Sequence, residues 1–94
     1  MYKDASPNDN LTVNIGLIGL GYIGLEVFKL IHEQHDYIMK KIGKDLKITV
    51  VAEKDLESKK ELVNKYKGIR FTGNPYEAIN DESIDIIVEL IGGV

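Results

Sequence analysis

The sequence contains no cysteine and no long hydrophobic run. Without cysteine, a disulfide framework, a thiolate metal site and a cysteine nucleophile are excluded. No apolar stretch approaches the roughly 18 residues of a membrane helix, and the polar first ten residues do not resemble a signal peptide. A net charge of −3 argues against a surface for nucleic acid or an anionic membrane. These absences predict a cytoplasmic protein that binds neither nucleic acid nor membrane.

The 94 residues are enough for one small domain, and the 44% hydrophobic and 29% charged fractions are those of an ordinary globular protein. Residues 1–10 are polar and predict a flexible N-terminal tail. Residues 11–94 alternate short β-branched runs with amphipathic segments. The predicted strands cover 13–18, 47–53, 69–72 and 84–91, and the predicted helices cover 22–41, 55–66 and 75–80.

This β-α-β-α-β-α-β order favours parallel strands joined by right-handed crossovers, with helices covering both faces of the sheet. We therefore predict an α/β fold, a Rossmann-like doubly wound parallel sheet of four strands in the order 3-2-1-4. Gly43 is expected to end the first helix, and Asn74-Pro75 to begin the last one.

Between the first strand and the first helix lies the motif G-x-G-x-x-G, formed by Gly19, Gly21 and Gly24. In a dinucleotide site the first glycine allows a tight turn, the second lets a pyrophosphate approach the backbone, and the third lets the helix pack closely. The free N–H groups at the start of the helix then face the phosphates. Such a motif alone is weak evidence, but its position after a strand and before a helix predicts nucleotide binding.

An acidic residue at the end of the second strand usually binds the adenine ribose, about 20 residues after the glycines. Here Glu53 follows Gly24 by 29 residues, and the long first helix accounts for the excess. A carboxylate from Glu53 or Asp55 favours NAD, whereas Lys54, with Lys59 and Lys60, favours the 2′-phosphate of NADP. The sequence leaves NAD and NADP open.

Gly92 and Gly93 follow the last strand, close to the predicted switch point of the sheet, where the nicotinamide side of a dinucleotide is expected. His32 and His35 are three residues apart, but no third ligand has a suitable spacing, so we predict solvated helix residues and no metal. No Ser/His/Asp triad or pair of catalytic carboxylates is apparent, and no catalytic residue is assigned.

Three segments resemble the N-terminal cofactor-binding part of homoserine dehydrogenase. They are Val13 to Gly24, Lys44 to Ala52 and Ile84 to Gly93, whose ending Glu-Leu-Ile-Gly-Gly is the most specific. The resemblance implies NAD(P)-dependent interconversion of L-aspartate 4-semialdehyde and L-homoserine, in the biosynthesis of threonine and methionine. By the family pattern, the pyrophosphate is cradled by Gly19, Gly21, Tyr22, Ile23 and Gly24.

By the same resemblance, position 54 contacts the ribose or its 2′-phosphate, and Gly92-Gly93 approach the nicotinamide ribose. Three residues depart from the family pattern. Lys54 replaces an arginine, Glu53 stands where an apolar residue is common, and Tyr22-Ile23 replaces Thr-Val. The negative charge of Glu53 favours NAD, and the Tyr22-Ile23 pair lacks the threonine hydroxyl that the family pattern offers to a phosphate.

The family's substrate-binding and catalytic residues lie beyond position 94. The resemblance therefore implies a fragment that is inactive alone, with the substrate domain absent. A fourth strand without a further neighbour exposes an apolar edge, which predicts self-association through residues 84–91. Two alternatives are a non-catalytic NAD(H)-sensing regulatory module and a domain that kept the fold but lost its ligand.

Overall fold

The computed structural model describes residues 11–91, so the predicted tail (residues 1–10) and the predicted site glycines Gly92 and Gly93 lie outside the described residues. The helices and strands follow one another in the predicted alternation. They are β1 (Thr12–Ile18), α1 (Tyr22–Glu33), α2 (His35–Ile42), β2 (Asp45–Ala52), the 3₁₀ helix η1 (Glu57–Lys59), α3 (Lys60–Lys65), β3 (Arg70–Thr72), α4 (Pro75–Ile79) and β4 (Ile86–Glu89).

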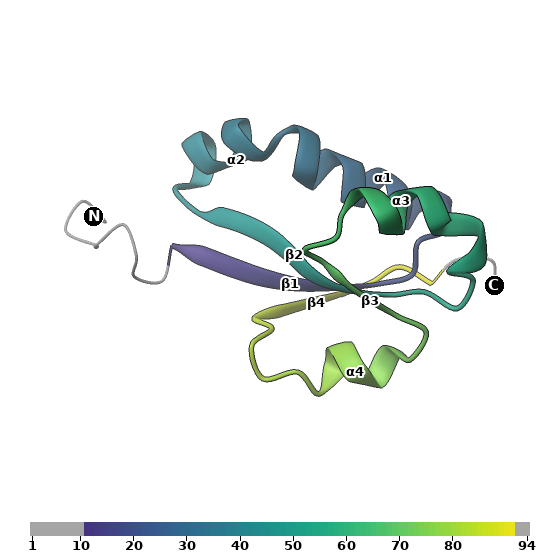
Figure 1. The fold of residues 1–94 in the computed structure, drawn as a ribbon. Helices are drawn as coiled ribbons and strands as arrows, with labels where there is room; N and C mark the ends of the chain where they lie inside the picture. The colour runs from purple at the N-terminus through teal and green to yellow at the C-terminus, as the bar shows by residue number, and fades with distance from the viewer. Residues whose placement is uncertain (1–10, 92–94) are drawn as a thin grey trace.

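The four strands form one parallel sheet in the order β3-β2-β1-β4, which confirms the predicted topology. Figure 1 shows three layers, with α1, α2 and α3 on one face of the sheet and α4 on the other. All four strands run the same way, so their carboxyl ends meet at one edge of the sheet. This edge is where open α/β sheets bind their ligands.

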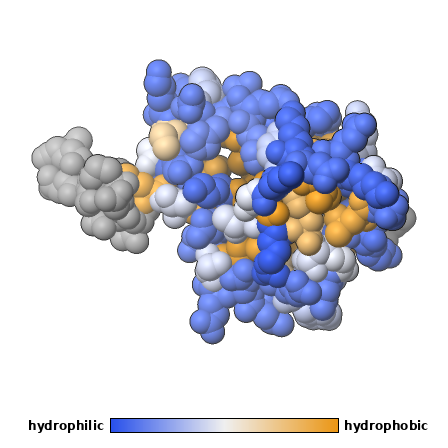
Figure 2. Space-filling view, viewed as in Figure 1, coloured by the Kyte–Doolittle hydropathy of each residue, from blue (hydrophilic) through white to orange (hydrophobic). Residues whose placement is uncertain are grey.

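Each face of the sheet has its own apolar cluster. Under α1 and α3 the buried residues are Ile15, Leu17, Leu20, Phe28, Ile48 and Val51. Under α4 they are Ile18, Val50, Ala52 and Ala78. Figure 2 shows hydrophilic residues over much of the outer surface and hydrophobic residues gathered between the helical layer and the sheet.

A β-bulge in β2 explains why Ile48 and Val51, which are three residues apart, lie on the same face of the sheet. The pairing with β1 shifts between Ile15, which is opposite Ile48, and Gly16, which is opposite Val50, so that Thr49 is the extra residue. A bulge reverses the alternation of side chains locally. Ile48 and Val51 therefore both reach the cluster under α1.

The prediction of one continuous helix over 22–41 was wrong, because the helix is interrupted at Gln34, whose φ and ψ are −105° and 22°. No proline or glycine marks the break. Two side chains near it make hydrogen bonds outside the backbone pattern of the helix. His32 Nδ1 bonds to the Phe28 carbonyl at 2.9 Å, and the His35 ring bonds to Asp45 at the start of β2. Bonding of a side chain to the backbone carbonyl four residues back is known to bend helices when the side chain is serine or threonine, and His32 makes the same kind of bond.

The predicted helix over 55–66 is also shorter than expected. Asp55 Oδ1 accepts the Ser58 N–H of the 3₁₀ helix η1 at 3.3 Å, the N-cap of η1 is Leu56, and the α-helix itself begins only at Lys60.

Strand boundaries differ as well. β2 starts at Asp45 rather than at position 47, because Asp45 pairs with Thr12 of β1. The predicted strand over 84–91 shortens to Ile86–Glu89, the four residues that pair with β1.

Candidate functional site

The glycine loop is tightly packed against its neighbours at the carboxyl edge. Gly19 has a φ of 103°, and a Cβ there would lie 2.7 Å from the Leu90 carbonyl oxygen of the β4 end. A Cβ on Gly24 would lie 2.0 Å from the Gly19 carbonyl oxygen. Neither position can hold a side chain without moving backbone, so both glycines are required by the turn from β1 into α1.

The start of α1 presents backbone donors without a side-chain partner of their own. Gly21 is the N-cap residue, it offers no side-chain cap, and no acidic residue lies in the first turn of α1. The first helical hydrogen bond runs from Leu25 N–H to the Gly21 carbonyl at 2.9 Å. The preceding N–H groups of Tyr22, Ile23 and Gly24 have no helical acceptor, and the positive end of the helix dipole favours an anion there.

Tyr22 and Ile23 border a cavity of about 780 Å³ at the carboxyl ends of the strands, whereas Gly24 is buried behind them and is not part of its lining. Its lining comprises Ile18, Gly19, Gly21, Tyr22, Ile23, Ala52, Glu53, Lys54, Gly73, Pro75, Leu90 and Ile91. Nothing lies within 4 Å of the place where a Gly21 Cβ would stand, so a side chain there would project into open space beside the loop. We call this cavity the carboxyl-edge cleft. The backbone of its glycine loop is open to a diphosphate, as a bound dinucleotide requires.

Of the predicted ribose-binding residues, the structure brings Glu53 and Lys54 into the wall of the carboxyl-edge cleft. The Glu53 carboxylate accepts two backbone N–H groups, from Leu20 at 2.6 Å and from Asp55 at 2.8 Å. Asp55 is not part of the wall, and its carboxylate instead accepts the Ser58 N–H of η1. Lys60 points elsewhere and pairs with Glu57 at 3.4 Å.

Sequence reasoning missed Gly73 and Pro75, which line the cleft from the segment after β3. The rule that ligands bind at carboxyl ends of strands could have suggested them, since they follow the predicted third strand. The sequence predicts Pro75 only as a helix start, which the structure confirms, because the Asn74 side chain caps α4 by accepting the Tyr76 N–H at 3.0 Å.

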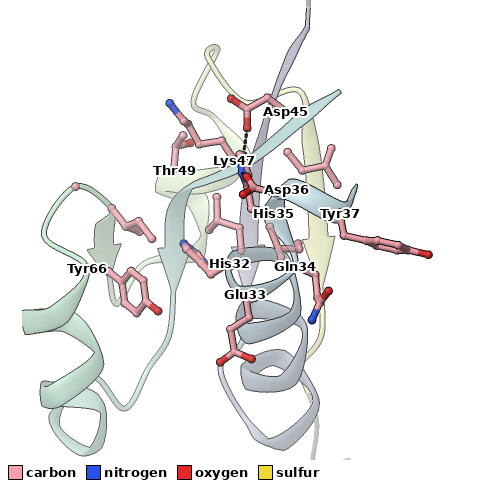
Figure 3. A pocket seen from close by; sticks show the side chains of 15 residues that line it. His32, Glu33, Gln34, His35, Asp36, Tyr37, Asp45, Lys47, Thr49 and Tyr66 are labelled. Carbon is pink, nitrogen blue, oxygen red and sulfur yellow. Dashed lines mark hydrogen bonds and ion pairs between the residues drawn. The ribbon is translucent and has the colours of Figure 1, made fainter. Parts of the chain in front are cut away.

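A second and larger cavity, of about 930 Å³, lies between the α1–α2 junction, the first half of β2 and the segment before β3 (Figure 3). We call it the amino-end cavity. His32 and His35, predicted to be solvated helix residues, are partly exposed, and both have partners among the described residues. The His32 ring packs against Phe28 and Tyr66 at centroid distances of 4.3 and 4.7 Å.

His35 bridges two acidic residues in this cavity. Its Nε2 faces Asp45 Oδ1, and its Nδ1 lies 3.2 Å from Asp36 Oδ1. The hydrogen bond with Asp45, followed by that with Asp36, raises the pKa of His35 above its ordinary value. Thr49 Oγ1, on the bulge, is buried without a hydrogen-bond partner among the described residues.

Within residues 11–91, no group of three His, Asp or Glu side chains is placed to hold a metal ion. The helices of that same region are all too short or too polar to cross a membrane.

Relatives in curated collections are named homoserine dehydrogenase. That of Bacillus subtilis is 39% identical over 82 residues, and that of Helicobacter pylori is 40% identical over 84 residues. Each match covers 87% of this chain but only 18% of the relative, so the chain spans less than a fifth of their length. No protein-family model matches the chain.

Solved structures give the same relationship. A crystal structure of Staphylococcus aureus homoserine dehydrogenase at pH 8.5 is 38% identical, with a TM-score of 0.73 over 88% of this chain and 20% of that one. The homoserine dehydrogenase of Thiobacillus denitrificans is 30% identical, with a TM-score of 0.74 over 87% of this chain and 18% of that one. The resemblance seen in the sequence is confirmed: the chain is homologous to part of homoserine dehydrogenase.

Proposed function

We propose that this homologue of part of homoserine dehydrogenase binds a nicotinamide dinucleotide, NAD or NADP, in the carboxyl-edge cleft. The observation that carries the proposal is the wall of that cleft, in which the glycine loop, the uncapped start of α1 and the end of β2 surround one cavity. The backbone N–H groups of Tyr22, Ile23 and Gly24 bind the pyrophosphate. Gly21 leaves room for it to approach.

The other predicted contacts stay proposals. Glu53 and Lys54 meet the adenosine side of the dinucleotide, since they line the same cavity at the end of β2. Asp55 contributes through its backbone N–H, which anchors Glu53. Ile91 lines the cleft after β4, on the other side of β1 from Glu53 and Lys54. We propose that Gly92 and Gly93, which follow Ile91 in the sequence, lie beside the nicotinamide ribose. When bound, the dinucleotide supplies or accepts the hydride.

We further propose that the reaction served is that of the family: interconversion of L-aspartate 4-semialdehyde and L-homoserine, in the cytoplasm, for threonine and methionine biosynthesis. The kinship with homoserine dehydrogenases supports this oxidoreductase role over a sensing module. The 94 residues alone are expected to be inactive, because no catalytic residue can be assigned among them.

Calorimetric titration of the chain with NADH and NADPH at low salt tests the binding proposal. Saturable binding of either cofactor at one site per chain is expected. The affinity should be modest, since the described cleft holds few groups for the nicotinamide half. An absence of binding at millimolar cofactor would contradict the proposal.

Self-association through residues 84–91 is a separate proposal about partners. β4 is at one edge of the sheet, and Ile86, Ile87 and Ile91 are 48%, 36% and 55% exposed. An exposed apolar edge strand offers a template for pairing with a second chain. Light scattering at increasing concentration should show dimers or larger species, and Ile86→Lys should reduce them. A monomer at high concentration would exclude this association.

A further inference from the structure

The Glu53 carboxylate joins the two segments that form the adenosine side of the carboxyl-edge cleft. One oxygen, Oε1, accepts the N–H of Leu20, which lies between the first two glycines of the loop, at 2.6 Å. The other oxygen, Oε2, accepts the N–H of Asp55 at 2.8 Å. Both oxygens are therefore anchored before any ligand arrives.

The backbone of Glu53 is held as well. Its N–H donates to the Thr72 carbonyl at 2.9 Å, which ties the residue to the neighbouring strand β3. Swinging the side chain away from the cleft would break two hydrogen bonds to a charged acceptor, which are about twice as strong as neutral ones. The negative charge at this point of the wall is thus fixed in place rather than mobile.

The only other charged residue in the wall among the described ones is Lys54, which is exposed. Its ammonium is a strongly hydrated point charge at the end of a flexible side chain. Unlike the planar guanidinium of arginine, it cannot make two parallel hydrogen bonds to a phosphate. In this part of the cleft the Glu53 carboxylate is therefore held in one position, whereas the Lys54 ammonium is free to change its position.

We infer that Glu53 determines cofactor specificity, favouring a dinucleotide with free adenine-ribose hydroxyls over one with a 2′-phosphate. This inference rests on the proposed function. Each anchored oxygen keeps a lone pair that can accept a ribose hydroxyl. A 2′-phosphate brought to the same place would meet a like charge that cannot move aside. Glu53 therefore both positions the glycine loop, through Leu20, and selects NAD over NADP.

The test compares two probes that isolate the adenosine half, ADP-ribose and 2′-phospho-ADP-ribose, together with NAD and NADP, by calorimetry at fixed low salt. For the unchanged chain we expect the ligands without the 2′-phosphate to bind at least tenfold more tightly. In Glu53→Gln the preference should fall toward unity, mainly because the phosphorylated ligands gain affinity. Glu57→Gln is the matched control: it removes the same charge from an exposed residue outside the cleft, and the preference should not change.

The outcomes separate the two proposals. Equal binding of both ligand classes by the unchanged chain, or tighter binding of the phosphorylated class, would overturn the specificity inference and leave dinucleotide binding intact. Binding of none of the four ligands would overturn both. The ratio in the unchanged chain decides the inference even if Glu53→Gln fails to fold. A preference that survives in a folded Glu53→Gln would show that another group selects the cofactor.

Discussion

The two cavities of this domain differ in what their polar groups already bind. In the amino-end cavity, which is the larger, the histidines have internal partners: His32 bonds to the Phe28 carbonyl, and His35 bonds to Asp45 and Asp36. In the carboxyl-edge cleft the start of α1 has no side-chain cap and no acidic residue in its first turn. Volume therefore does not identify the binding site. The adjacent backbone donors at the start of α1 do, whereas the amino-end cavity holds one buried side-chain atom without a partner among the described residues, Thr49 Oγ1.

This contrast has a structural cause. The amino-end cavity lies where helix ends and strand starts meet through side chains, and its two histidine rings have hydrogen-bond partners there. The carboxyl-edge cleft is framed by backbone whose N–H groups are fixed in direction by the glycine loop. Gly19 and Gly24 hold that loop because neither has room for a Cβ.

The largest expected effect follows from the close packing under the loop. Gly24→Ala would place a methyl group 2.0 Å from the Gly19 carbonyl oxygen, a contact with backbone that no rotamer change relieves. We expect a loss of about 3 kcal/mol in the free energy of unfolding, the upper end for an overpacked site. Urea unfolding measures it. Gly68→Ala, where nothing lies within 4 Å of the added Cβ, is the control and should change stability little. A stable Gly24→Ala protein would mean that the loop is not packed as described.

A pair of leucine substitutions compares the two cavities directly. Gly21 lines the carboxyl-edge cleft and Gly68 lines the amino-end cavity, and both have open space around the Cβ position. Gly21→Leu should lower dinucleotide affinity by more than about tenfold, or about 1.4 kcal/mol, with the domain still folded. Gly68→Leu should bind as the unchanged chain does. Calorimetry gives the affinities and thermal melting checks the fold. If Gly21→Leu binds normally, or Gly68→Leu loses binding, the cleft has been assigned to the wrong edge.

The smallest effect is a pH dependence that belongs to the amino-end cavity. Because the pKa of His35 is raised by Asp45 and Asp36, the protonated ring stabilises the folded state. That stabilisation is fully present below the ordinary histidine pKa and is lost as the pH rises through the raised value. The His35 side chain is 38% exposed, so solvent screening limits the contribution to about 0.5 kcal/mol.

Unfolding of the unchanged chain and of Asp45→Asn at pH 5.5 and 8.5 measures this contribution. The stability difference between the two proteins should be larger at pH 5.5. Dinucleotide affinity should be the same in both, since Asp45 lies outside the carboxyl-edge cleft. A difference that is larger at pH 8.5 would reverse the assigned role of His35.

Local signals in the sequence predicted several ends of elements and the position of the glycine loop. Gly43 ends α2 in the left-handed conformation, and Asn74 with Pro75 begins α4, as expected from their preferences for those positions. The glycine spacing placed the loop between β1 and α1. Each of these features depends on residues a few positions apart, so a sequence contains enough information to identify them.

Features that depend on contacts between distant segments could not be predicted. The break at Gln34 accompanies a bond from His35 to Asp45, and the bulge at Thr49 follows from the register between β1 and β2. The sequence left Glu53, Lys54 and Asp55 as equal candidates. Only the fold shows that Glu53 reaches Leu20, 33 residues away, whereas Asp55 turns to η1.

The most direct test of the central claim is an NMR titration of the ¹⁵N-labelled chain with NAD, followed at the backbone amides. We predict saturable shifts at Leu20, Gly21, Tyr22 and Ile23, around the carboxyl-edge cleft, with the amides of His32, His35 and Gly68 unmoved. Shifts centred on the amino-end cavity, or none at saturating NAD and NADP, would contradict the account.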